Sequence, residues 1–415
     1  MKIIRSSSKQ FSKLRERNSA SKERIVESVR RIIEDVRLHG DDALIKYTKK
    51  FDKVKLNPKQ FRVSESETSG AYQDISPDFI NTLKIVIENV TRFYKKQFRK
   101  DWKMSGGDGI VLGQRHCPLD CVGVYVPSGT VPLVSSVYMT VLPAKIAGVK
   151  KVVLLTPPNK YCSVDPHILV VANLLKVDEI YKIGGAQAIA AMALGTKVIP
   201  KVDKIIGPGN DYVTEAKRQV FGYVDIDMIA GPSELVIIAN QYSNPVYVAA
   251  DLKAQGEHFK GLAILVTNSK KLAKSVKHEV EKGYIILVKN LEEACEVTNI
   301  LAPEHLQIMV KSPQKVLKKI RNAGAIFIGP YTPTAVGDYI AGPSHVLPTG
   351  GTAKFFSGLN LNDFIKNTHV ISYSKKALER MREPVEKISG IEGLKGHSES
   401  VKIRFEEKQD EKKKD

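Results

Sequence analysis

A carboxylate and an imidazole stand side by side in the stretch LAPEHLQ (residues 301–307), as Glu304 and His305. Adjacent residues of a helix or strand point in different directions, so these two side chains converge on one reacting centre only from a turn or an irregular segment. Pro303 provides such a break between an expected helix and an expected strand. The pair has the composition of an acid/base site, and a solvated loop remains the alternative interpretation.

A second group of side chains carries donor atoms of the kind that bind metal ions. In the stretch DLKAQGEH (251–258), Gln255 and His258 stand three residues apart on a predicted helix, which places both on one face. Asp338 and His397 lie in segments that are punctuated by glycine. An ordinary surface histidine remains the alternative for His258. The sequence contains no HExxH motif, which argues against a zincin-type hydrolase.

Three further segments place glycine directly after an expected strand: YVPSGT (125–130), IGGAQA (183–188) and IGPGND (206–211). Ligand sites of open parallel sheets lie at the carboxyl ends of the strands, in such turns. Glycine lets the backbone approach a phosphate, and the following helix offers free N–H groups. No G-x-G-x-x-G or P-loop motif occurs, so the turns favour a nucleotide site while tight turns without a ligand remain the alternative.

The elements that position these residues follow from the periodicity of apolar residues. An apolar stripe predicts a helix over residues 21–38, and more helix is expected at about 78–98. From Val122, short β-branched runs alternate with helical segments, and a second such series begins at Leu235. This pattern predicts an α/β fold with two Rossmann-like, doubly wound α/β domains and with helical N-terminal and C-terminal segments. Helix is expected again at about 375–388, before a charged tail, EEKQDEKKKD, predicted to be disordered.

Composition limits the class of protein. A chain of 415 residues with 42% hydrophobic and 26% charged residues is expected to be globular, with two or three domains. No apolar run approaches the roughly 18 residues of a membrane span, so a cytoplasmic protein without a membrane partner is expected. The four cysteines, Cys117, Cys121, Cys162 and Cys295, are too scattered to indicate a disulfide framework. His116 with Cys117 and Cys121 matches no common zinc spacing.

The net charge of +19 raises nucleic-acid binding as an alternative, and the run RFYKKQFRKDWK (92–103) interleaves aromatic and basic residues. The same run also fits an amphipathic helix with a solvated basic face. The basic excess is spread over the whole chain, and no nucleic-acid-binding motif is present. We therefore expect no nucleic-acid partner, whereas the positive field would favour an anionic dinucleotide.

Six motifs together resemble those of the histidinol dehydrogenase family. They are GPGNDYVTEAKRQVFG, IDMIAGPSE, DLKAQGEH, LAPEHLQ, VGDYIAGPSHVLPTGGTAKFFSGL and EGLKGHSES. They stand in the order that this family shows, and the resemblance covers about residues 20 to 403. Two positions depart from the family pattern: Ser128 stands where glycine is usual, and Gly256 stands where alanine is usual.

The resemblance implies a homodimeric, zinc-containing enzyme that oxidises L-histidinol through L-histidinal to L-histidine with NAD. It implies that Glu304 and His305 are the catalytic acid/base residues, because an alcohol must lose a proton as its hydride leaves and a water must then be activated to attack the aldehyde. A dehydrogenase of the same family that acts on another small amino or sulfonated alcohol is the alternative. The presence of Glu392 and His397 favours histidinol.

The resemblance also implies the binding residues and their division between subunits. Zinc would be held, one ion per subunit, by Gln255, His258, Asp338 and His397. The substrate would contact these four residues together with Ser233, His305 and Glu392. NAD would contact Tyr125, Gln187 and Asn210. The C-terminal segment would cross to the partner, so that His397 and Glu392 complete the partner's active site.

Four parts of the chain are expected. They are an N-terminal segment (1–24), an α/β domain that carries the zinc and catalytic residues (25–121 with 235–360), an NAD-binding α/β domain (122–234), and a helical C-terminal dimerisation segment (361–415).

Overall fold

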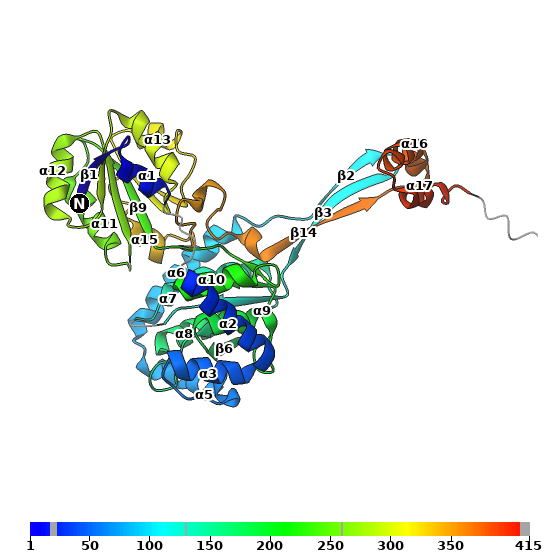
Figure 1. The fold of residues 1–415 in the computed structure, drawn as a ribbon, viewed down its shortest axis with the longest axis horizontal. Helices are drawn as coiled ribbons and strands as arrows, with labels where there is room; N and C mark the ends of the chain where they lie inside the picture. The colour runs from blue at the N-terminus through cyan, green and yellow to red at the C-terminus, as the bar shows by residue number, and fades with distance from the viewer. Residues whose placement is uncertain (17–22, 129–130, 259, 407–415) are drawn as a thin grey trace, which may run out of the picture. The chain divides into compact units, whose positions relative to one another are not determined.

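The computed structural model describes residues 1–16, 23–128, 131–258 and 260–406. The chain forms two compact units, of which the first contains Met1–Phe98 and Pro118–Phe364 and the second contains Arg99–Cys117 and the chain from Ile365 on. The first unit contains two parallel sheets with helices between their strands, so the predicted α/β class is confirmed (Figure 1). Among the described residues, no helix is long and apolar enough to cross a membrane.

The smaller sheet of the first unit has five parallel strands in the order β6-β5-β4-β7-β8. The strands are β4 (Cys121–Tyr125), β5 (Lys151–Thr156), β6 (Glu179–Lys182), β7 (Lys204–Ile206) and β8 (Asp225–Ile226). The helices after the first four are α7 (Val134–Ala147), α8 (Pro166–Leu174), α9 (Gly185–Leu194) and α10 (Asp211–Val220). Successive strands are added first on one side of β4 and then on the other. The direction reverses between β4 and β7, and such a reversal opens a crevice at the carboxyl ends of the two strands.

The larger sheet has six parallel strands in the order β1-β11-β10-β9-β12-β13. They are β1 (Lys2–Arg5), β9 (Glu234–Ala239), β10 (Leu262–Thr267), β11 (Tyr284–Leu287), β12 (His305–Met309) and β13 (Ala325–Ile328). The associated helices are α1 (Lys9–Arg15), α11 (Pro245–Gln255), α12 (Lys270–Glu279), α13 (Leu291–Leu301), α14 (Pro313–Leu317) and α15 (Thr334–Tyr339). The sequence analysis missed β1, a four-residue strand with one buried side chain.

Alternate residues of β9 enter two separate hydrophobic cores, which shows that the larger sheet is covered on both faces. Val236 and Ile238 pack with residues of α1 and α13, whereas Leu235 and Ile237 pack with residues of α11 and α12. Continuous apolar strands are the expected sequence signature of a parallel sheet buried in this way. The doubly wound arrangement is therefore confirmed for this sheet.

The N-terminal helices of the first unit are α2 (Glu23–His39), α3 (Asp41–Phe51), α4 (Pro58–Phe61), α5 (Glu65–Ala71) and α6 (Pro77–Lys95). The helices expected near 21–38 and 78–98 correspond to α2 and α6. The predicted apolar stripe of α2 is buried except for Ile25, which is partly buried, and α2 and α3 pack on α9 in the core of the five-stranded sheet. Both sheets lie in one compact unit, so the division into units does not mark a boundary between the two expected α/β domains. The domain boundaries expected from the sequence therefore stay a prediction.

The second unit is a three-stranded sheet with two helices. The sheet order is β14-β3-β2, formed by β2 (Trp102–Gly107), β3 (Ile110–Pro118) and β14 (Ile365–Ser372), and the helices are α16 (Lys375–Ile391) and α17 (Lys395–Lys402). In the β2–β3 turn, Asp108 forms ion pairs with Lys376 and Arg380 of α16. The helix expected near 375–388 is confirmed, and all of the charged tail except Glu406 lies outside the described residues.

The interpretation of the basic run 92–103 as one amphipathic helix is wrong. Helix α6 ends at Lys95, and Trp102 already begins the antiparallel β2–β3 hairpin. Trp102 belongs to a strand instead, because the pairing of the hairpin overrides the local helical pattern of the run.

Asp52 allows a prediction about the stability of this fold. It follows the C-terminus of α3, and burial raises the pKa of its carboxyl to about 6. Because the pKa in the folded state is above the unfolded value, ionisation opposes folding, increasingly from about pH 4 to above pH 6. Asp52→Asn should therefore raise the free energy of unfolding at pH 8 by about 1–2 kcal/mol, after allowance for partial burial, and should change it little at pH 4.

The matched control for Asp52→Asn is Asp42→Asn, in the first turn of the same helix, where a negative charge is favourable. Chemical denaturation of both variants at the two pH values measures the effect. An equal gain in both variants, or a gain for Asp52→Asn that does not depend on pH, would show that the buried charge is not the cause.

Candidate active site

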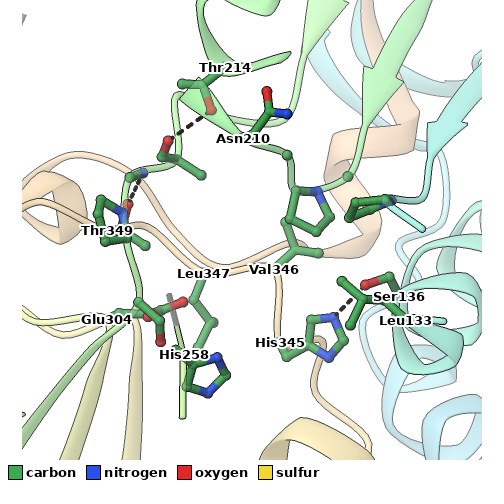
Figure 2. A pocket seen from close by; sticks show the side chains of 18 of the residues that line it. Leu133, Ser136, Asn210, Thr214, His258, Glu304, His345, Val346, Leu347 and Thr349 are labelled. Carbon is green, nitrogen blue, oxygen red and sulfur yellow. Dashed lines mark hydrogen bonds between the residues drawn. The ribbon is translucent and has the colours of Figure 1, made fainter. Parts of the chain in front are cut away.

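A cavity of about 620 Å³ lies within the first unit and contains most of the side chains that the sequence analysis singled out (Figure 2). Its walls come from the turn after β7, the start of α7, the linker before β9, the start of β12 and the loop after α15. The five-stranded sheet therefore contributes the carboxyl end of β7 at the β4–β7 crevice. The six-stranded sheet contributes the amino ends of β9 and β12.

Glu304 and His305 occupy the break that the sequence predicted. Helix α13 ends at Leu301, and Ala302, with φ of 45°, turns the chain before β12 begins at His305. Both side chains are almost fully buried, with exposed fractions of 7% and 4%. They converge, because the His305 Nδ1 atom is 3.3 Å from Oε2 of Glu304.

The backbone of Glu234, the first residue of β9, holds both side chains of the pair. Its N–H donates a hydrogen bond of 2.8 Å to Oε2 of Glu304, and its carbonyl oxygen is 3.1 Å from Nδ1 of His305. A carbonyl oxygen only accepts, so Nδ1 of His305 is the donor. The neighbouring amino ends of two parallel strands thus fix a carboxylate and an imidazole in one place.

The second ring nitrogen of His305 faces another carboxylate. Its Nε2 atom is 3.2 Å from Oδ1 of Asp338, which belongs to α15. Burial lowers the pKa of His305, but the carboxylates of Glu304 and Asp338 outweigh burial and raise the pKa to about 10. In this arrangement both ring nitrogens donate and the ring is an imidazolium between two acceptors.

His345 is a cavity residue that the sequence analysis did not assign. Its Nδ1 atom donates to the carbonyl oxygen of Asp338 at 3.0 Å, so its Nε2 atom is left to accept from Oγ of Ser136 at 3.3 Å (Figure 2). Burial lowers the pKa of His345, which favours the neutral ring that this pairing requires. The signal that would have found it is a histidine in the same glycine-punctuated stretch as Asp338.

The expected metal ligands are only partly brought together within the chain. His258 and Asp338 line the cavity, and Gln255 is buried next to it, where its amide nitrogen donates to Oγ of the cavity residue Ser233 at 3.1 Å. His397 lies in α17 of the second unit. Over the described ranges, no group of three or more His, Cys, Asp or Glu side chains is arranged to hold a metal ion.

The expectation that Gln255 and His258 share one face of a helix is wrong. Helix α11 ends at Gln255 with Gly256 as its C-cap, so His258 lies outside the helix and is exposed. Glycine ends helices readily because it loses the most conformational freedom in them. Gln255 thus reaches the cavity region from the end of a helix, and His258 reaches it from the following loop.

The three expected cofactor residues all lie at the glycine turns of the five-stranded sheet. Asn210 lines the cavity and caps α10, since its Oδ1 atom accepts from the N–H groups of Tyr212 and Val213. Tyr125, at the end of β4, is buried and accepts from the N–H of Gly185 at 3.0 Å. Part of the first turn, residues 129–130, lies outside the described residues.

Gln187 is the unusual member of this group. Its side chain is fully buried in α9, and neither atom of its amide has a hydrogen-bond partner among the described residues. A buried amide without partners is unfavourable by about 1–3 kcal/mol, so a ligand that supplies the partners would be stabilised there. Gln187 and Tyr125 are not lining residues of the cavity itself.

Fold and site together define a class of protein: a Rossmann-like α/β protein with a glycine-rich crevice and a buried carboxylate–imidazole pair at one cavity. The family model "Histidinol dehydrogenase" matches residues 15–405. The chain belongs to the histidinol dehydrogenase family and is therefore an enzyme, an oxidoreductase.

Individual relatives agree with this family assignment. The chain is 47% identical to a histidinol dehydrogenase of Bacillus cereus over 95% of this chain and 96% of the relative. It is 46% identical to one of Clostridium acetobutylicum, with 96% of each chain covered. It is also similar to the crystal structure of histidinol dehydrogenase from Elizabethkingia anophelis, with a TM-score of 0.92, 34% identity and 98% of each chain covered.

Gly207 gives a prediction about the turn that borders the cavity. It has φ of 124°, and a Cβ atom at this position would lie 2.0 Å from the carbonyl oxygen of Tyr125. Gly207→Ala should therefore destabilise the fold by more than about 3 kcal/mol, since neither backbone segment can move without leaving the sheet. Denaturant unfolding and soluble yield measure the loss.

Gly222→Ala is the matched control, because Gly222 has φ of 102° and no atom within 4 Å of the added carbon. Gly222→Ala should lower the free energy of unfolding only by the strain of a positive φ, about 1–3 kcal/mol. Equal losses of stability in the two variants would contradict the close approach of the β4 and β7 turns.

Proposed function

We propose that this chain is a zinc-containing, NAD-dependent enzyme of histidine biosynthesis that oxidises L-histidinol through L-histidinal to L-histidine. The observation that carries the proposal is the buried Glu304–His305 pair, which faces a cavity bordered by the glycine turn at the end of β7. Membership of the family supports the substrate, and the relatives that the chain matches are named histidinol dehydrogenases.

The proton transfers of the reaction are assigned to the Glu304–His305 pair. In the first step the alcohol loses its hydroxyl proton as a hydride leaves its carbon, and in the second a water loses a proton as it attacks the aldehyde carbon. Glu304 would accept a proton, and His305, which is an imidazolium in this arrangement, would donate a proton and then be reprotonated. The Oε2 atom of Glu304 is engaged by the Glu234 N–H, so Oε1 is the oxygen that remains for proton transfer. NAD, when bound, would take up the hydride in each of the two oxidations.

NAD would bind across the carboxyl ends of β4 and β7, with contacts from Tyr125, Gln187 and Asn210. The residues fit such a ligand, because the buried amide of Gln187 has no partner in the described structure and Gly207 brings the backbone close to the crevice. The Oδ1 atom of Asn210 is engaged in the helix cap, so its amide nitrogen is the group left for the ligand. A dinucleotide is the ligand that this crevice suits by its topology.

Zinc would be held by Gln255, His258 and Asp338 of this chain and by His397 of the partner subunit. Imidazole nitrogen and carboxylate or amide oxygen are ligands that zinc accepts, and the donors of this chain lie in or beside one cavity. The metal would anchor the amino and imidazole nitrogens of the substrate. Ser233, His305 and, from the partner subunit, Glu392 would complete the contacts with the substrate.

A homodimer with a shared active site is part of the proposal. The second unit presents exposed apolar side chains on α16 and in the segments before and after α17: Ile388, Ile391, Leu394 and Ile403. Exposed apolar side chains of this size, when they form one patch, are typical of a protein interface. Dimerisation would cover them and bring His397 and Glu392 to the partner's cavity.

The direct test is a NAD-reduction assay with purified protein and L-histidinol. The proposal predicts two NADH for each histidinol consumed and histidine as the product, with loss of activity after chelation of the metal. Small amino alcohols and sulfonated alcohols serve as competing substrates in the same assay. A clear preference for one of them over histidinol would replace the substrate in this proposal.

Replacing His305 by Asn tests the acid/base assignment. Turnover should fall by about two or more orders of magnitude, because the proton transfers lose their imidazole, while zinc content and dimerisation stay at wild-type values. His278→Asn is the control, since His278 is an exposed histidine at the end of α12. Unchanged kinetics in His305→Asn would remove this residue from the mechanism.

Mixing two inactive variants tests the shared site. His258→Ala and His397→Ala subunits should recover about a quarter of wild-type activity after random exchange, since half of the dimers are mixed and each has one intact site of two. Each variant exchanged with itself is the control and should stay inactive. A mixture that remains inactive, although labelled subunits are shown to have exchanged, would place both ligands at a site within one chain.

A further inference from the structure

We infer that the buried ion pair of Lys217 and Asp227 is a positioning device that fixes the glycine turn after β7 for the cofactor. This inference rests on the proposed function, because it names residues that prepare the proposed NAD crevice. Neither residue was singled out by the sequence analysis, and neither takes part in the proton transfers assigned above.

The two charged side chains bind both backbone polar groups of Gly207, its N–H and its C=O. Nζ of Lys217 donates to the carbonyl oxygen of Gly207 at 3.0 Å and also pairs with the carboxylate of Asp227. Oδ2 of Asp227 accepts from the N–H of Gly207 at 2.8 Å. Gly207 is therefore held from both sides by opposite charges that also neutralise each other.

The pair acts at the point where the sheet stops supporting the backbone. The β7–β8 ladder continues as far as the N–H of Asp227, which donates to Ile205 at 3.1 Å. One residue after β7 ends, the Gly207 N–H and C=O form their hydrogen bonds with the two charged side chains instead. The ion pair thus extends the ordered part of β7 into the turn.

The turn fixed in this way borders the cavity directly. Gly207, Pro208, Gly209 and Asn210 all line it, as does Asp227. The far end of the turn is held by the Asn210 cap on α10, and Lys217 belongs to the same helix. Both ends are thus held, and the N–H groups at the start of α10 keep a fixed place relative to β4. Such preorganisation strengthens binding because less freedom is lost when the ligand arrives.

Burial makes a purely stabilising role a poor explanation of the pair. The side chains of Lys217 and Asp227 are only 3% and 1% exposed, so both charges have lost their hydration. Replacing such a pair by apolar or neutral groups of similar size is often neutral or stabilising for a fold. What neutral groups do not reproduce here is the simultaneous hold on the N–H and the C=O of Gly207.

The test is the double variant Lys217→Met/Asp227→Asn, which leaves no unpaired buried charge. We expect it to fold with a melting temperature near that of wild type. Its dissociation constant for NAD, and its KM for NAD, should rise by about tenfold or more while kcat at saturating NAD changes less than about threefold. Amide exchange of a peptide covering residues 206–213 should become faster in the ligand-free double variant, which reports on the turn without any cofactor.

Lys204→Met is the matched control, because Lys204 is a buried lysine at the other end of β7 and pairs with Asp225 at 2.9 Å, away from the cavity. It should leave the NAD dissociation constant and the exchange of residues 206–213 unchanged. If the double variant unfolds, the more closely isosteric pair Lys217→Gln/Asp227→Asn, which also leaves no unpaired buried charge and keeps an oxygen acceptor for the Gly207 N–H, takes its place with the same expected changes of smaller size.

Wild-type NAD affinity and unchanged exchange in a folded double variant would overturn the inference. A wild-type enzyme that does not bind NAD would instead overturn the proposed function. The exchange measurement on residues 206–213 would still decide whether the ion pair fixes the turn.

Discussion

A charged group is tolerated in a protein interior only where other groups replace its lost hydration, and this constraint applies to the charged groups at the cavity. The carboxylate of Glu304 and the ring of His305 are nearly fully buried, and each is compensated by the other, by the backbone of Glu234 and, for His305, by Asp338. Such compensation requires the amino ends of β9 and β12 to be neighbours in exact register, since His305 lies opposite Leu235. The pairing of these two parallel strands is thus a condition for the site.

The two sheets present opposite ends to the same cavity. The five-stranded sheet contributes the turn at the carboxyl end of β7, where glycine and a helix N-terminus suit a dinucleotide. The six-stranded sheet contributes strand starts, where the buried acid/base pair is fixed to the backbone of a neighbouring strand. The glycine turn and the acid/base pair are thereby positioned by different sheets. The Ser136–His345 hydrogen bond joins α7 of the first sheet to the loop after α15.

Much of the fold could be predicted because its information is local. Runs such as VVLL (152–155) and LVIIA (235–239) are apolar at every position, which is the pattern expected of a strand buried on both faces. The break at Pro303 could also be predicted from local information, because proline interrupts a helix. The missed elements carry weak local patterns: β1 has one buried side chain in four residues, and β2 is exposed along its whole length. The helical spacing of Gln255 and His258 led to a wrong prediction, because the glycine between them ends the helix.

The sequence by itself determined the α/β class, the alternation of strands and helices, the glycine turns and, through ordered motifs, the family. It could do so because these depend on residue type and on spacings of a few residues. Only the tertiary structure decided which strand ends meet, that Glu234 fixes Glu304 and His305 through its backbone, and that Lys217 and Asp227 hold Gly207 from both sides. Every residue except proline carries the same backbone N–H and C=O groups, so hydrogen bonds to them are not visible in the sequence. They become visible only when the folded chain brings residues as distant as Glu234 and Glu304 into contact.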